Sequence, residues 1–182
     1  MTANKGFTLV ELLVVIAIAA VLASVAAPSM SAFIQSNRIR GAVGTYVSDM
    51  RFARAEAIKR GGGVVLCRSD SPESSAASCS TGSTLHGWVG GWIVFHDLDG
   101  NGQRNGAEPL LRVQVPWPGI DDIVEFNSSG VQQTSTTAFK FVATGRFASL
   151  ASATTLRFGG ANYPVSRRQT VCVSLGGRVR VA

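Results

Sequence analysis

Residues 126–182 contain no aspartate and no glutamate, although they contain one lysine and six arginines. Residues 69–125 have the opposite balance, with eight acidic residues against two arginines. The net charge of +6 therefore hides a basic region that directly follows an acidic one. A basic region without acidic residues favours binding of a polyanion. Such a region also occurs as an ordinary solvated face without a partner.

Histidine and cysteine are scarce, with two and three residues. His86 and His96 have no nearby nucleophile, and the cysteine spacing does not suit zinc. We therefore predict no catalytic constellation, no enzyme activity and no cofactor. Outside the cytoplasm the cysteines could pair. A Cys67–Cys79 bridge across the Ser-rich loop 68–78 is the first choice, which leaves Cys172 free and buried in a strand, and a pairing of Cys172 with either of the others is the alternative.

Charge is almost absent between Phe7 and Ala27, where Glu11 is the single charged residue among 21. A helix of this length and composition can cross a bilayer core of about 30 Å. A carboxylate in lipid costs roughly 2.5–3.5 kcal/mol or more, so Glu11 should have a cationic partner. Residues 1–6 are too short for a secretory signal, and the apolar segment follows them. We expect this segment to stay in the mature protein.

The sequence Gly6-Phe7-Thr8-Leu9-Val10-Glu11 resembles the cleavage and methylation motif of type IV prepilins and type II secretion pseudopilins. The resemblance implies that a prepilin peptidase cuts after Gly6 and methylates Phe7. It also implies that Glu11 neutralises the terminal amine of a neighbouring pilin subunit. The expected location is the inner membrane of a Gram-negative bacterium, with a single span and a periplasmic head, and then an extracellular pilus.

Apolar residues resume at helical spacing after Pro28, and Gly61-Gly62-Gly63 should end the helix. The helix end 50–60, the glycine break and the short β run Val64–Cys67 resemble the FimT/GspH branch of minor pilins and pseudopilins. The resemblance implies an α+β pilin fold, with a long N-terminal helix packed on an antiparallel β-sheet head. We expect a leader at 1–6, a transmembrane and assembly helix at 7–28, its continuation into the head at 29–60, and a β-rich head at 61–182.

An acidic loop connects two predicted strands, 91–95 and 110–115. Its residues Asp97, Asp99, Asn101 and Glu108 match the calcium-loop pattern D-x-D-x-N-G-x₅-E. The usual context of that pattern is a pair of helices, whereas both flanks here resemble strands, and a long hairpin turn uses the same residue types. The expectation is therefore no metal, with these four residues as weak calcium candidates. Further strands are expected at 123–126, 138–143, 154–158 and 170–175.

The sequence ends in two alternating runs separated by Gly176-Gly177, which predicts a tight hairpin. Alternation places Val179 and Val181 on the core face and Arg178 and Arg180 on the other. The two arginines leave the backbone about 6.6 Å apart, which suits two neighbouring phosphates. Charge on an edge strand also protects it from aggregation, which is the simpler interpretation.

The run Gly177-Arg178-Val179-Arg180 resembles the G-R-x-R motif of DNA-binding FimT-type minor pilins. This resemblance implies that Gly177, Arg178 and Arg180 form a site for DNA, and charge alone adds Arg167 and Arg168 as helpers. The predicted function is that of a type IV minor pilin that binds extracellular DNA without sequence specificity for natural transformation. The alternative is a structural minor pilin or pseudopilin that primes assembly or secretion without touching DNA.

Overall fold

Helix α1 extends from Leu9 to Arg60 in the computed structural model, which describes residues 6–82, 86–134, 138–148 and 152–182, with the backbone alone at 25–28. The predicted helix begins two residues earlier, at Phe7. The chain divides into two compact units, the first ending at Asn37 and the second beginning at Arg38. The predicted segment boundaries at residues 6, 28 and 60 stay predictions.

The first unit exposes its apolar side chains. Every residue from Gly6 to Ser24 is exposed, including Leu9, Ile18 and Leu22. An 18-residue window of this part of α1 has a mean hydropathy of 2.8, and α1 is long and apolar enough to cross a membrane. Such a surface is stable only against lipid or against other apolar helices.

The second unit contains the end of α1, where one stripe of the helix is buried. Its buried apolar residues recur at spacings of three and four, as an amphipathic helix requires: Ile39, Ala42, Val43, Tyr46, Val47, Met50, Ala53 and Ala57. Gly61 follows with φ +81°, the left-handed conformation that commonly ends a helix. The chain then turns back along the helix as a strand.

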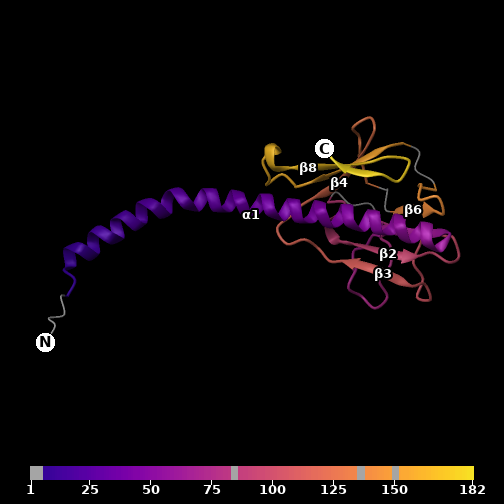
Figure 1. Cartoon of the computed structure of the whole chain (residues 1–182), viewed down its shortest axis with the longest axis horizontal. Helices are drawn as coiled ribbons and strands as arrows, with labels where there is room; N and C mark the ends of the chain where they lie inside the picture. Colours follow the sequence, from indigo (N-terminus) through magenta and orange to yellow (C-terminus); the bar gives the residue numbers. More distant parts are fainter. Residues whose placement is uncertain (1–5, 83–85, 135–137, 149–151) are drawn as a thin grey trace. The chain divides into compact units, whose positions relative to one another are not determined.

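Two antiparallel sheets complete this unit. The first sheet has the order β3-β2-β1-β6 and the second has the order β5-β4-β7-β8-β9. Figure 1 shows β2 and β3 on one side of α1 and β4 and β8 on the other. The first sheet comprises β1 (Gly62–Arg68), β2 (Trp92–His96), β3 (Leu110–Gln114) and β6 (Ala138–Val142). The second comprises β4 (Ile123–Asn127), β5 (Gln132–Gln133), β7 (Thr154–Phe158), β8 (Gln169–Val173) and β9 (Val179–Val181). Two short 3₁₀ turns, η1 (Trp88–Gly90) and η2 (Val165–Arg167), lie between strands.

The α+β prediction is confirmed, because a long helix packs on antiparallel sheets. The two-residue strand β5 was not predicted, since Gln132-Gln133 has no apolar pattern. Strand β8 ends at Val173, two residues before the predicted end, because Ser174 already begins the turn to β9.

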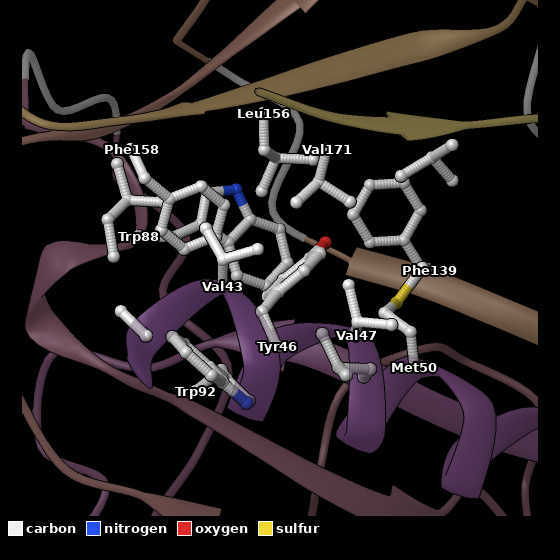
Figure 2. Packing of buried hydrophobic residues seen from close by; sticks show 14 of the residues in the cluster. Val43, Tyr46, Val47, Met50, Trp88, Trp92, Phe139, Leu156, Phe158 and Val171 are labelled. Atoms are coloured by element: carbon white, nitrogen blue, oxygen red, sulfur yellow. The ribbon is translucent and has the colours of Figure 1, made fainter. Parts of the chain in front are cut away.

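The main core lies between α1 and both sheets. Figure 2 shows the Tyr46 ring reaching from α1 toward Trp88, Leu156 and Val171. The Tyr46 ring meets those of Trp92 and Phe158 edge-on, with centroids 5.4 and 5.7 Å apart. Such edge-to-face pairs stabilise a core beyond the area that they bury.

A second apolar cluster lies on the outer face of the first sheet. Val65, Cys67, Ile93 and Phe95 are buried there under Ala77 and Cys79. The loop that carries these two residues is joined to β1 by a Cys67–Cys79 disulfide. Of the pairings that the sequence leaves open, the structure therefore has the first choice.

Candidate functional site

The hairpin of β8 and β9 forms one edge of the second sheet. The amide of Ser174 donates to the carbonyl of Arg178 at 2.9 Å, and the amide of Gly177 donates to the carbonyl of Ser174 at 2.9 Å. The connection is thus a three-residue loop, Leu175 to Gly177, closed by a glycine at φ +75°. The predicted tight hairpin is present, with Leu175 in its loop beside the two glycines. The extra residue places Gly177 at a bulge and lets Arg178 enter the strand pairing.

The register of the hairpin fixes which side chains share a face. Cys172 lies opposite Arg180 and opposite Thr155 of β7. Directly opposite residues of antiparallel strands lie on the same face, so these three form a row across the outer face. Val171 and Val173 are buried on the core face.

A groove of about 620 Å³ runs along this outer face. Both Arg178 and Arg180 line it, together with Thr155 and Cys172. Both arginines are exposed, and in the described part of the chain no ion pair involves either of them. The groove therefore combines small side chains in its lining with two exposed guanidinium groups.

Cys172 occupies a different position from the predicted one. It is partly exposed at the groove and carries a free thiol. Cys172 is predicted to be buried because its neighbours in the strand, Val171 and Val173, are apolar. Only the two valines face the core, because successive side chains of a strand point to opposite faces.

Acidic side chains are absent from the strands of the second sheet except for Glu125 of β4. Glu125 lies on the core face, opposite Leu156, and accepts a hydrogen bond from the Thr154 hydroxyl at 2.8 Å. Burial raises the pKa of Glu125 to about 7, against the bonds from Thr154 and Trp88 that lower it. The outer face of these strands thus has arginine without carboxylate.

Arg167 and Arg168 lie at the other end of β8 from the hairpin loop. Arg167 is in η2, and Arg168 donates from Nε to the Tyr163 carbonyl at 3.0 Å. The five residues of β8 separate them from that loop by roughly 15 Å. Neither lines the groove, so the structure does not bring these helpers next to Arg178.

Gly177 has a structural reason to be glycine. A Cβ atom on it would overlap the carbonyl oxygen of Gly145, and its φ of +75° disfavours other residues. The loop of the β8–β9 hairpin is therefore packed directly against the turn that follows β6. Sequence reasoning assigned Gly177 to the DNA motif and did not foresee this contact.

The acidic loop between β2 and β3 brings its carboxylates together. Oxygen atoms of Asp97, Asp99 and Glu108 lie within 4.8 Å of one another and could hold a cation. The Asp97 carboxylate is 2.8 Å from Nζ of Lys140, which also donates to the Gly100 carbonyl at 2.6 Å. Lys140 thus brings a positive charge to the loop.

Burial opposes the charge on Asp97, but the bonds from Lys140 and from the amides of Gly102 and Gly100 outweigh it and lower the pKa of Asp97. Asn101, the remaining predicted ligand, donates from its side-chain amide to Asp99 at 2.8 Å. The expectation of no metal, with these residues as weak calcium candidates, stays a prediction, and both flanks of the loop are strands, as expected.

At the other end of the chain, Gly6 and Phe7 precede α1 and are exposed. The Thr8 amide and hydroxyl donate to the Glu11 carboxylate at 2.8 and 2.9 Å, and the Glu11 amide donates to the Thr8 hydroxyl at 3.2 Å. This reciprocal pattern is a capping box, which the Thr-x-x-Glu spacing could have predicted. In the single chain, Glu11 is thus bound by the first turn of its own helix.

Comparisons with known proteins agree with this architecture. The prokaryotic N-terminal methylation motif matches residues 1–27, and the family model of type II transport protein GspH matches residues 42–177. Two crystal structures of the type IV minor pilin FimU from Pseudomonas aeruginosa are similar. One has a TM-score of 0.55 and covers 82% of this chain and 92% of that chain, and the other has 0.51 with 79% and 91%. Both are 15% identical in sequence, so the likeness concerns the fold.

The chain begins with a methylation motif and an exposed apolar helix, and a head of helix and sheets follows. This combination defines a pilin-like subunit. The chain belongs to the GspH family, as a minor pilin or pseudopilin of the type IV pilus and type II secretion class. Membership implies processing by a prepilin peptidase, a membrane-anchored helix and assembly with other pilin subunits.

Proposed function

We propose that this minor pilin binds extracellular DNA through the groove at the β8–β9 hairpin, for DNA uptake in natural transformation. The observation that carries the proposal is that Arg178 and Arg180 both line one open groove. Guanidinium groups bind phosphate through paired hydrogen bonds, and a face without carboxylates does not repel the backbone. Binding through phosphates carries no sequence information.

The remaining roles in this proposal concern filament assembly. Cleavage follows Gly6, the new terminus at Phe7 is methylated, and Glu11 neutralises the amine of a neighbouring subunit. The exposed apolar unit supports this role, because it needs partners of its own kind once it leaves lipid. The inner membrane and then the pilus surface of a Gram-negative bacterium are the places where such a subunit would act.

The test measures binding of a fluorescein-labelled DNA duplex of random sequence to the full-length protein in non-ionic detergent. Arg178→Gln with Arg180→Gln should weaken binding at least tenfold at low salt. It should also reduce the slope of log K against log salt by about 1.8, or 0.9 for each lost phosphate contact. Unchanged circular dichroism would show that the fold is intact.

A matched control replaces two other exposed cations. Arg38→Gln with Arg40→Gln removes the same charge from α1, and neither residue lines the groove. This variant should bind DNA within about twofold of the original chain, since distant charges are screened beyond about 10 Å. Equal binding by both double variants would reject the groove as the site and favour the structural role alone.

A further inference from the structure

We propose that Arg146, on the turn after β6, is a third DNA-contacting arginine beside Arg178. This inference rests on the proposed function and extends its surface from the groove across the β8–β9 loop onto a second turn. Arg146 is separated from Arg178 by 32 positions in the sequence, and it is outside the motif that indicated the first two arginines. A contact between Gly145 and Gly177 joins the turns that carry Arg146 and Arg178, and the two turns have the same hydrogen bonds.

The contact places the two turns together. A Cβ atom on Gly177 would overlap the carbonyl oxygen of Gly145 and lie 3.3 Å from the Phe141 ring. Gly145 is buried, and a Cβ atom on it would meet Nε of Arg54 and Cδ1 of Ile58 at 2.9 Å. The turn after β6 therefore lies between two other segments. It contacts the β8–β9 loop through Gly177 and the end of α1 through Arg54 and Ile58.

The two turns have the same construction. In the first, the Val142 amide donates to the Arg146 carbonyl at 2.9 Å, and the Gly145 amide donates to the Val142 carbonyl at 2.8 Å. In the hairpin, Ser174, Gly177 and Arg178 make the equivalent bonds, each 2.9 Å long. Each turn has a glycine at positive φ, +71° and +75°, followed at once by an exposed arginine.

The consequence is a pair of arginines held on two touching turns. Because the glycines meet, Arg146 and Arg178 leave the backbone on adjoining parts of the surface. Two closed turns keep the starting points of these side chains fixed, which reduces the ordering that binding requires. Arg54 adds a third guanidinium beneath Gly145, so the electrostatic potential here favours an anion.

The charge around this pair has the right sign for a polyanion. Residues 126–182 include both turns and contain no acidic residue. On the nearby helix end, Glu56 is paired with Arg60 at 2.6 Å and with Lys59 at 3.7 Å. A DNA backbone that occupies the groove at Arg180 and Arg178 would thus continue onto Arg146 with no carboxylate of that segment beside it.

The experiment measures duplex DNA binding by full-length Arg146→Gln in non-ionic detergent between about 50 and 200 mM salt. Binding should weaken roughly three- to tenfold, and the salt slope should fall by about 0.9, as for one lost phosphate contact. Arg146→Lys should restore the slope, since an ammonium also neutralises a phosphate, whereas a disturbed turn would not be rescued in this way. Arg40→Gln is the matched control and should leave both values unchanged.

The outcomes separate this inference from the proposed function. If Arg146→Gln behaves like Arg40→Gln while the Arg178/Arg180 double variant loses binding, Arg146 is not a contact and the groove remains the site. If the double variant binds DNA normally, the proposed function fails and this inference fails with it. If Arg146→Gln and Arg146→Lys are equally impaired, the residue acts on the fold of the turn and the inference is wrong.

Discussion

The outer faces of the two sheets differ in what covers them. On the first sheet, Val65, Cys67, Ile93 and Phe95 lie under a loop clamped by the Cys67–Cys79 disulfide. On the second, Thr155, Cys172 and Arg180 lie along an open groove. The same core supports both sheets, so the difference arises from the outward residues of the strands. Apolar outward residues require a cover, whereas polar ones leave a face available to a ligand.

The charges follow the same division. The covered sheet carries the acidic loop, in which the carboxylates are bound by backbone amides and by Lys140. The open sheet has its single strand carboxylate on the core face. A polyanion that approaches the second unit is therefore attracted to one sheet and repelled from the other.

The largest expected effect comes from removing the clamp of the covered sheet. Cys67→Ser with Cys79→Ser opens a cross-link between residues 12 apart, and loss of such a link should lower the free energy of unfolding by about 3 kcal/mol. Urea denaturation of the full-length protein in detergent measures this. DNA binding under folding conditions should stay unchanged, because the groove is on the other sheet. A parallel loss of DNA binding in folded protein would contradict the independence of the two faces.

The second prediction concerns Glu125, the carboxylate beneath the open sheet. Its pKa of about 7 in the folded protein lies above the ordinary value of 4.5. The folded state therefore holds a proton that the unfolded state releases, and stability declines as the pH rises from about 4.5 to 7. At about 1.4 kcal/mol per pKa unit, the total loss is about 3 kcal/mol.

Glu125→Gln removes this dependence, because the amide stays neutral. The difference in unfolding free energy between Glu125→Gln and the original chain should be near zero at pH 4 and grow to about 3 kcal/mol in favour of glutamine at pH 8. Urea titrations at a series of pH values measure this difference in unfolding free energy. The contributions of the other titrating groups cancel in it, because they are the same in both proteins. A constant difference across this range would show that burial of Glu125 does not suppress its charge.

Much of the fold could be predicted because local signals agreed with the final packing. The apolar run after Gly6, the glycines at 61–63 and the alternation of Thr154–Phe158 each specify their element without information from elsewhere. The Val64–Cys67 run is apolar at every position, and the structure covers both of its faces. The pattern within one segment was sufficient to predict an element wherever the structure of that element depends on its own residues.

The errors lie where two distant segments meet. Cys172 was predicted to be buried because its neighbours are apolar, but the pairing with β7 and β9 places it on the open face. The contact of Gly177 with Gly145 and the partnership of Lys140 with Asp97 also join segments that are far apart in sequence. Only the sheet order and the register determine such contacts, and the amino-acid pattern of one segment does not contain them.

The third prediction tests the docking of the hairpin that forms the open edge. Gly177→Ala places a Cβ against the Gly145 carbonyl at a φ of +75°, so we expect a loss of about 2 kcal/mol in unfolding free energy. DNA binding should also weaken, because Arg178 shifts. Gly176→Ala is the matched control, since its Cβ would meet only the Ser174 hydroxyl at 4.0 Å. Equal melting temperatures for the two variants would show that the contact between the loops does not stabilise the hairpin.

The smallest expected effect uses Cys172 as a reporter of the open face. Its thiol is the free one, since Cys67 and Cys79 are joined, and it lies opposite Arg180 in the groove. DNA bound to Arg178 and Arg180 should shield it from N-ethylmaleimide. With duplex at about ten times its dissociation constant, the unoccupied fraction and hence the alkylation rate should fall roughly tenfold. High salt should restore the rate, because it releases the DNA. If the rate is the same with and without DNA while anisotropy shows saturation, then DNA binds elsewhere, and the contrast between a covered and an open sheet does not explain where the ligand goes.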